Sequence, residues 1–196
     1  LVDAVADANA ADIPVVSFDS GLNDGAEIVT YVATDNRAGG RLAARRLAEV
    51  LDGQGEVILL RFMEGSESTF QREEGFLEEI ANFPEITVLS SNEYGEDSVS
   101  RAKSKVQQLL QRFPTVDGLF AVCESNANGA LEALIESEQA GKLRFVAFDP
   151  SERLIEAVKA GQCDGIVLQD PVKMGYESVM ALVRHLEGKL NVICSQ

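Results

Sequence analysis

Short apolar segments and longer amphipathic segments alternate along this chain. Apolar segments such as 55–62 (GEVILLRF) and 116–122 (VDGLFAV) contain few polar positions, which is typical of strands covered on both faces of a parallel sheet. The segments between them repeat apolar residues at helical spacing. In the segment 97–112 these residues are Val99, Ala102, Val106, Leu109 and Leu110.

The alternation predicts an α/β fold with doubly wound parallel sheets and right-handed crossovers. The predicted strands are 13–18, 28–33, 55–62, 86–91, 116–122, 143–149 and 163–170. The predicted helices are a helix ending near 11, then 35–51, 66–82, 97–112, 124–137, 151–160 and 171–186. A Gly-, Asn- and Asp-rich loop is expected at 19–27.

The last predicted helix begins at Pro171, which suits a first turn because that position needs no backbone donor. The apolar residues that we expect on its buried face are Val172, Gly175, Val179, Leu182, Val183 and Leu186. The chain opens in a helix that no strand precedes, whereas a βαβ protein normally starts with a strand. We therefore interpret the chain as a fragment of a larger domain pair.

Polar residues stand at the ends of three predicted strands. They are Asp19, Asp149 and the pair Gln169 and Asp170. Open α/β sheets bind ligands in the crevice outside the carboxyl ends of their strands, so these residues together favour a small polar ligand held by hydrogen bonds. The alternative for each aspartate is that it caps the following helix.

Composition narrows the possible functions. The chain has 196 residues and a formal net charge of −15, which opposes nonspecific binding to phosphate backbones. Cys123, Cys163 and Cys194 lack metal-ligand spacing, and His185 is the single histidine. We therefore expect no zinc site.

The sequence also gives no sign of catalysis or of a bound cofactor. Phosphate-binding glycine motifs are absent, and no Ser, His and Asp are arranged for nucleophilic catalysis. Gly39 and Gly40 lie inside a predicted helix, where we expect them to permit close packing. The prediction is a binding protein that is not an enzyme and that uses no cofactor.

Six stretches of the chain resemble one known family. They are ADIPVVSFDSG, TDNRAGGRLAARRL, STFQREEGF, LFAVCESNANGALEAL, FVAFDP and VLQDPVKMGYESV. In order and spacing they resemble the ribose-binding-protein-like periplasmic sugar-binding proteins over essentially the whole chain. The resemblance implies a type I periplasmic-binding-protein fold with two lobes, one of them incomplete because the first part of the family pattern is absent.

The resemblance further implies the solute-binding component of an ABC sugar transporter. Such a protein binds a monosaccharide or similar polyol in a cleft between the lobes, which closes by hinge motion. Its partners would be the sugar and a membrane permease, with no nucleic acid, and its location periplasmic or lipid-anchored extracytoplasmic. Residues 1–33 and 170–196 would belong to the N-terminal lobe, and 34–169 would form the C-terminal lobe.

The resemblance extends to five candidate ligand residues. Asp19 and Asp149 match carboxylates that accept from sugar hydroxyls, and Arg72 matches an arginine that donates to sugar oxygens. Gln169 matches an amide at a crossing between the lobes. Cys123 stands where the family commonly has Asn, so either the pocket is less polar there or the thiol packs into the sheet while Glu124 or Asn126 takes the polar role.

Three further positions are possible ligand residues. Ser20 stands where the family often has Arg, which puts ribose itself in doubt. Phe70 stacks on a sugar or fills the core, and Tyr94 is near the position of an expected aromatic residue, although the gapless match falls on Asp97. For Arg72 the alternative is a surface ion pair with neighbouring glutamates.

Two other functions share this fold. One is the effector-binding core of a lactose-repressor-like transcription regulator, which would carry a DNA-binding helix pair upstream. The other is the input domain of a chemoreceptor or sensor kinase. The stretch VLQDPVKMGYESV resembles the transport proteins more than the repressors.

Overall fold

The chain divides into two units, which the computed structural model describes over residues 2–22 and 27–189. A small unit comprises residues 1–35 and 169–196, and a large unit comprises residues 36–168. The middle of the predicted loop, 23–26, and Cys194 lie outside the described residues. The assignment of these units to an N-terminal and a C-terminal lobe stays a prediction.

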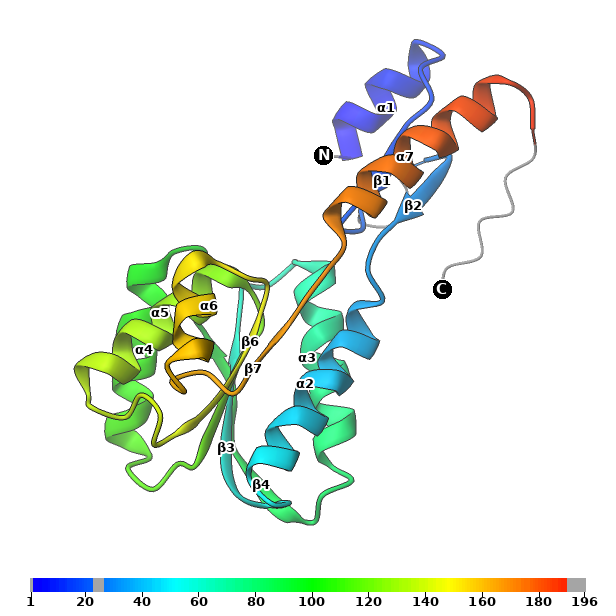
Figure 1. The fold of residues 1–196 in the computed structure, drawn as a ribbon. Coiled ribbons are helices and arrows are strands. Elements are labelled where there is room, and N and C mark those ends of the chain that lie inside the picture. The colour runs from blue at the N-terminus through cyan, green and yellow to red at the C-terminus, as the bar shows by residue number, and fades with distance from the viewer. Residues whose placement is uncertain (1, 23–26, 190–196) are drawn as a thin grey trace. The chain divides into compact units, whose positions relative to one another are not determined.

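The large unit is built on one parallel sheet with the strand order β4-β3-β5-β6-β7 (Figure 1). Its strands are β3 (Gln54–Arg61), β4 (Glu85–Tyr94), β5 (Gly118–Ala121), β6 (Arg144–Phe148) and β7 (Gly165–Val167). Its helices are α2 (Asn36–Val50), α3 (Glu67–Ile80), α4 (Val99–Arg112), α5 (Glu124–Glu136) and α6 (Glu152–Lys159). The predicted doubly wound α/β fold is confirmed.

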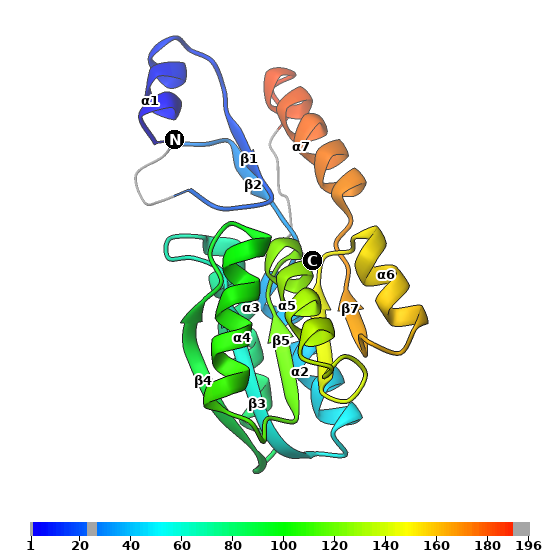
Figure 2. The same cartoon turned by 90° about the vertical axis from the view of Figure 1, so that its left-hand side faces the viewer.

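Helices cover both faces of this sheet, as Figures 1 and 2 show, with α2 and α3 on one face and α4, α5 and α6 on the other. Successive residues of β3 point to opposite faces, as strand geometry requires. Val57 and Leu59 pack with α2 and α3, whereas Ile58 and Leu60 pack with α4 and α5. Both faces are therefore apolar, which is why the strand reads as a continuous apolar run.

The chain order of the strands reverses between β3 and β5, which are neighbours in the sheet. From β3 the chain passes through α3 to the edge strand β4, whereas from β5 it proceeds through α5 to β6 on the other side. Such a switch point opens a crevice outside the carboxyl ends of the strands. The segments that follow β3, β5 and β6 meet at this edge.

The small unit contains α1 (Val2–Ala10), the parallel pair β1 (Val16–Phe18) and β2 (Thr30–Val32), and α7 (Pro171–Leu186). Asp170 caps α7, because its side chain accepts a hydrogen bond from the Lys173 amide at 2.9 Å. For Asp170 the capping interpretation is therefore confirmed.

The predicted buried face of α7 is wrong. The helix buries Met174, Ser178 and Ala181, whereas Val172 is 81% exposed. Of the other large apolar residues on the predicted face, Leu182 is partly buried and the rest are exposed, namely Val179, Val183 and Leu186. Ser178 tolerates burial because its hydroxyl donates to the Met174 carbonyl at 2.7 Å. The buried face of α7 therefore includes the small residues Ser178 and Ala181, and the face that carries the larger Val172 and Val179 is exposed.

None of the helices within the described ranges combines the length and the apolar character that a membrane crossing requires.

Candidate functional site

Arg72 lies buried at the carboxyl edge of the large sheet, with 4% of its side chain exposed. Its Nε donates to Asn36 Oδ1 at 2.8 Å. Its Nη1 donates both to the Val122 carbonyl at 3.0 Å and to Asp149 Oδ2 at 3.2 Å. The alternative that Arg72 forms a surface ion pair with neighbouring glutamates is therefore wrong. The arginine instead joins α2 and α3 to the ends of β5 and β6.

Asp149 follows β6 with its backbone in the left-handed region, at φ 65°. Aspartate tolerates this conformation better than most residues. Its amide donates to the Val167 carbonyl at 3.0 Å, which fixes the turn against β7. Asp149 does not cap α6, because Ser151 does so by accepting from the Leu154 amide. The capping interpretation is wrong for this residue, and its carboxylate pairs with Arg72 instead.

The guanidinium of Arg72 stacks on the aromatic ring of Phe148. The Arg72 Cζ atom lies 3.8 Å from the ring centroid, a cation–π contact that strengthens when the cation is desolvated. Phe148 itself is fully buried in the core shared with α2 and α3. Three acceptors and one ring therefore hold the guanidinium, as a buried cation requires. We call Arg72, Asn36, Phe148 and Asp149 the Arg72 cluster.

The Asp149 carboxylate is more exposed than its partner, at 22% of the side chain. The pair therefore presents an acceptor-rich anion toward solvent while the cation stays beneath it. Because the two charges oppose each other, the pair itself has little net charge. Such a site suits a neutral ligand whose groups both donate and accept hydrogen bonds.

Cys123 is half-buried beside this pair, at the N-cap of α5. Its Sγ lies 3.5 Å from Ser125 Oγ. Burial raises the pKa of the thiol, so at neutral pH it is a weak donor and a weak acceptor. Asn126 is fully buried and donates to the Arg61 carbonyl at 2.7 Å, and a polar role of Asn126 or Glu124 at the site stays a prediction.

The remaining candidates belong to the small unit. Asp19 is exposed and directly follows β1, and Ser20 is partly buried next to it. Gln169 is partly buried, and its Oε1 accepts from the Thr34 hydroxyl at 2.8 Å. The structure brings Arg72, Asp149 and Cys123 together within the large unit. That Asp19 and Gln169 join them stays a prediction.

The two aromatic candidates differ in position. Phe70 is 50% exposed on the first turns of α3, so the expectation that it fills the core is wrong. Tyr94 ends β4 and lines a hollow with Ser104, Lys105 and other residues of α4. Both residues stay predictions as ligand residues.

Sequence reasoning missed two members of the cluster. Asn36 reads as an ordinary residue at a helix start, and Phe148 reads as an ordinary apolar core residue of a strand. The only signal was indirect, since Asn36 lies in the quoted stretch TDNRAGG and Phe148 directly precedes Asp149.

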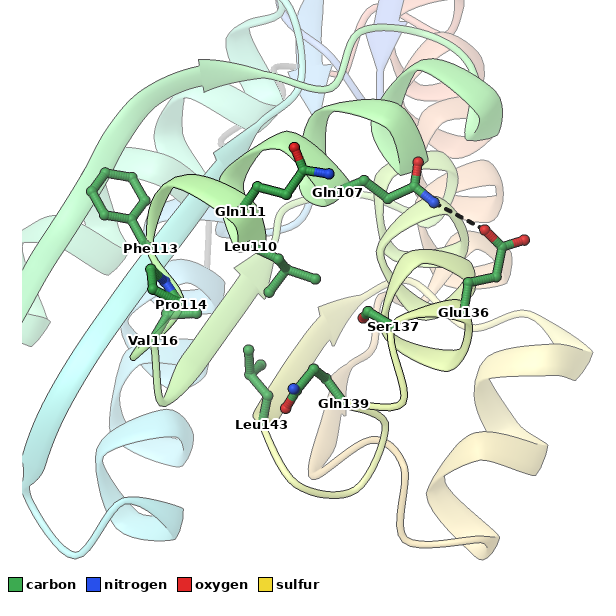
Figure 3. Close-up of a pocket in the computed structure, with 10 residues that line it drawn as sticks. All are labelled: Gln107, Leu110, Gln111, Phe113, Pro114, Val116, Glu136, Ser137, Gln139 and Leu143. Carbon is green, nitrogen blue, oxygen red and sulfur yellow. Dashed lines mark hydrogen bonds between the residues drawn. The ribbon is translucent and has the colours of Figure 1, made fainter.

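A hollow of about 530 Å³ lies elsewhere on the large unit, between the last turns of α4 and α5 (Figure 3). Gln107, Gln111, Gln139 and Leu143 line it, and Gln107 donates to Glu136 at 2.9 Å. Leu143 directly precedes β6, so this hollow is at the amino edge of the sheet. Because α/β sheets bind ligands at the opposite edge, the Arg72 cluster is the stronger candidate.

Within residues 2–22 and 27–189, no three His, Cys, Asp or Glu side chains gather in a way that could hold a metal ion.

Comparison with known proteins identifies the family. Residues 1–190 match the model of the periplasmic binding protein domain. The ribose import binding protein of Haemophilus influenzae is 31% identical over 187 residues, which are 95% of this chain and 62% of that protein. The corresponding protein of Escherichia coli is 32% identical, with the same two coverages. The chain thus spans less than two thirds of these relatives.

Solved structures agree. The periplasmic component of an ABC-type sugar transport system from Hahella chejuensis is 38% identical with a TM-score of 0.89, covering 96% of this chain and 69% of that chain. An ABC transporter solute-binding protein from Agrobacterium vitis, bound with α-D-tagatopyranose, is 31% identical with a TM-score of 0.90, covering 96% and 66%.

All of these relatives are named as binding or transport components, and none of them is a transcription regulator. The fold and the match over residues 1–190 lead to the same conclusion. The chain belongs to the periplasmic binding protein domain family, is similar to its ribose-binding members, and has the type I periplasmic-binding-protein fold.

Proposed function

We propose that this chain is part of the solute-binding component of an ABC sugar importer. Its ligand is a monosaccharide or a similar polyol, bound without chemical change. The observation that carries the proposal is the ion pair between the buried Arg72 and the partly exposed Asp149, at the carboxyl edge of the large sheet beside its switch point. It combines a donor-only cation with an acceptor-only anion, and sugar hydroxyls satisfy both.

Electrostatics support a neutral ligand over an anionic one. Arg72 already donates to the Asp149 carboxylate, to the Val122 carbonyl and to Asn36. An anionic ligand would face the Asp149 carboxylate at close range and would lose energy through like-charge repulsion. Hydroxyl groups would instead donate to that carboxylate through charge-assisted hydrogen bonds.

We further propose that Asp19 and Gln169 of the small unit contact the same ligand, with Ser20 and Phe70 at its edge. Thr34 donates to Gln169 Oε1, and an amide side chain can both donate hydrogen bonds to sugar oxygens and accept them from sugar hydroxyls. In this proposal residues 1–33 and 170–196 belong to the N-terminal lobe and 34–169 to the C-terminal lobe, and hinge closure traps the sugar between them.

The partner and location follow from the same proposal. The loaded protein would deliver its sugar to a membrane permease outside the cytoplasm, as a periplasmic or lipid-anchored protein. The resemblance to ribose, apiose and allose import proteins supports this role. No observation favours the repressor or the sensor-domain alternative.

A calorimetric screen tests the proposal. The panel contains ribose, allose, apiose, tagatose and fucose, because similar proteins are named for these sugars or were solved with them. We expect at least one of them to bind the chain. Asp149→Ala should weaken that binding by about 3 kcal/mol, because it leaves a buried cation and a sugar hydroxyl poorly paired.

Asp117→Ala is the matched control for this screen. Asp117 accepts from the Glu56 amide at 2.8 Å at the amino edge of the same sheet, so its loss removes a hydrogen-bonded carboxylate far from the proposed site. We expect its sugar affinity to stay within about twofold of the parent. Equal losses in Asp117→Ala and Asp149→Ala, or no binding of any sugar by the parent, would contradict the proposal.

A further inference from the structure

The position of Arg72 depends on how closely α2 and α3 approach each other. A Cβ atom added at Gly40 of α2 would lie 2.0 Å from the Arg72 carbonyl oxygen. A Cβ atom added at Gly75 of α3 would lie 2.1 Å from the Arg37 carbonyl oxygen. Real Cβ atoms cannot come this close, so the two backbones touch only because both positions are glycine. The expectation that Gly40 permits close packing of α2 is therefore confirmed.

The same face of α2 also holds the Arg72 side chain. Asn36 is the first residue of α2, is fully buried, and accepts from Arg72 Nε at 2.8 Å. Residues four apart lie on one helix face, so Asn36 and Gly40 together contact the side chain and the backbone of one arginine. The helix crossing at Gly40 and the hydrogen bond from Arg72 to Asn36 therefore both fix the position of Arg72.

A third contact from α2 reaches the ring beneath the guanidinium. The position of a Cβ atom on Gly39 would be 2.9 Å from the Phe148 ring, and this ring supports Arg72 Cζ at 3.8 Å. The ring can lie there because Gly39 has no side chain. Two successive glycines thus place α2 against the arginine backbone and against its aromatic support.

An arginine side chain loses considerable rotamer freedom when it is held in one geometry. A binding site gains affinity when this cost is met before the ligand arrives. In the large unit, the helix crossing and Asn36 hold the guanidinium between the Val122 carbonyl and the Asp149 carboxylate through contacts within the protein.

We propose that Asn36, Gly40 and Gly75 are positioning residues of the sugar site. They act through Arg72: the two glycines set the distance between α2 and α3, and Asn36 orients the guanidinium toward Asp149. This inference rests on the proposed function for its effect on sugar binding. Its structural part, that these three residues immobilise Arg72, can be tested without any sugar.

The first test observes the Arg72 Nε–H group by NMR, with Arg72→Lys identifying its signal. Burial and the bond to Asn36 should protect this proton from solvent exchange in the parent. We expect exchange to become at least about tenfold faster in Asn36→Leu and in Gly40→Ala, because each loosens the guanidinium. Unchanged protection in both variants would overturn the proposal.

Gly129→Ala is the matched control. Its Cβ atom would lie 2.5 Å from the Val99 carbonyl oxygen, which is the same kind of helix clash, but between α4 and α5 on the opposite face of the sheet. It should lower stability as Gly40→Ala does while leaving Arg72 Nε–H protected. Equal loss of protection in Gly129→Ala would show general loosening of the unit and would also overturn the proposal.

The second test measures sugar affinity in double-mutant cycles with Arg72→Ala. Asn36→Leu and Gly40→Ala should each weaken binding at least about tenfold in the parent and less than about twofold in the Arg72→Ala background. Equal losses in both backgrounds would mean that these residues do not act through Arg72. Ligand-observed NMR at millimolar sugar reaches the weak affinities of the double variants.

The outcomes separate the two claims. A parent chain that binds no sugar of the panel contradicts the proposed function, while the exchange measurement still decides whether Asn36 and Gly40 position Arg72. If Gly40→Ala does not fold, Asn36→Leu carries both tests, because it leaves the helix crossing intact.

Discussion

The two units contain the same four-residue pattern and the same backbone around it. The pattern is Val-Ser-Phe-Asp at 16–19 and Val-Ala-Phe-Asp at 146–149. In each unit the aspartate has a positive φ, 70° for Asp19 and 65° for Asp149. Each aspartate amide donates to the last residue of the neighbouring strand, at 2.9 Å to Val32 and 3.0 Å to Val167.

The surroundings of the two patterns differ. Phe148 is fully buried and supports Arg72, whereas Phe18 is 59% exposed. Asp149 forms an ion pair with a buried arginine, whereas Asp19 is exposed. The comparison teaches that the local sequence sets the strand and its turn, while α2 and α3 supply the buried arginine and its asparagine partner to one of the two turns.

The largest expected difference concerns the two phenylalanines. Phe148→Ala should lower the free energy of unfolding by about 3–5 kcal/mol, because it leaves a cavity in the core and removes the support of Arg72. Phe18→Ala should change it by less than about 1 kcal/mol, because the ring is largely exposed. Urea unfolding followed by circular dichroism measures both, and equal losses would show that burial does not distinguish the two patterns.

A smaller difference is expected for the two aspartates. Asp149→Asn should lower the free energy of unfolding by about 2 kcal/mol, because Arg72 is then buried without an anionic partner. The loss stays below the largest values for buried pairs because the carboxylate is 22% exposed. Asp19→Asn should stay within about 0.5 kcal/mol. The same urea titrations decide, and a larger loss at Asp19 would reverse the comparison.

The smallest expected effect is a difference between glycine and alanine variants, and it should be the same at Asp19 and at Asp149. Alanine has no side-chain hydrogen bonds to support a left-handed backbone, whereas glycine adopts it without strain. At both Asp19 and Asp149, the glycine variant should therefore be more stable than the alanine variant by about 1 kcal/mol. The difference between the two melting curves at each position is the measurement. A difference at only one position would show that the two turns are not equivalent.

Much of the fold could be predicted from the sequence because it depends on short-range patterns. An apolar run followed by a polar residue identified the strands and placed Asp149 at an edge, and helical spacing identified the face of α4 that includes Ala102, Val106 and Leu109. Boundaries were less certain in the small unit. The strand predicted at 13–18 spans only Val16–Phe18, and within the described residues it pairs with β2 alone.

The features that the sequence did not predict depend on which helix faces pack against each other. The spacing of apolar residues along the chain does not specify this. The contact of Asn36 with Arg72 joins residues 36 positions apart through a helix crossing. The face of α7 was wrong because Val172 and Val179 are more apolar than Ser178, yet the strands contact the stripe that includes Ser178. For Phe70 the sequence left stacking on a sugar and filling the core as alternatives, and the residue is 50% exposed.

A crystal structure of the chain with the sugar that binds best in the screen tests the central claim most directly. The account predicts sugar hydroxyls within hydrogen-bond distance of the Asp149 carboxylate and the Arg72 guanidinium, with the Arg72 side chain unmoved. A sugar seated instead in the hollow of Gln107 and Gln139 between α4 and α5, with no contact to Asp149, would contradict it.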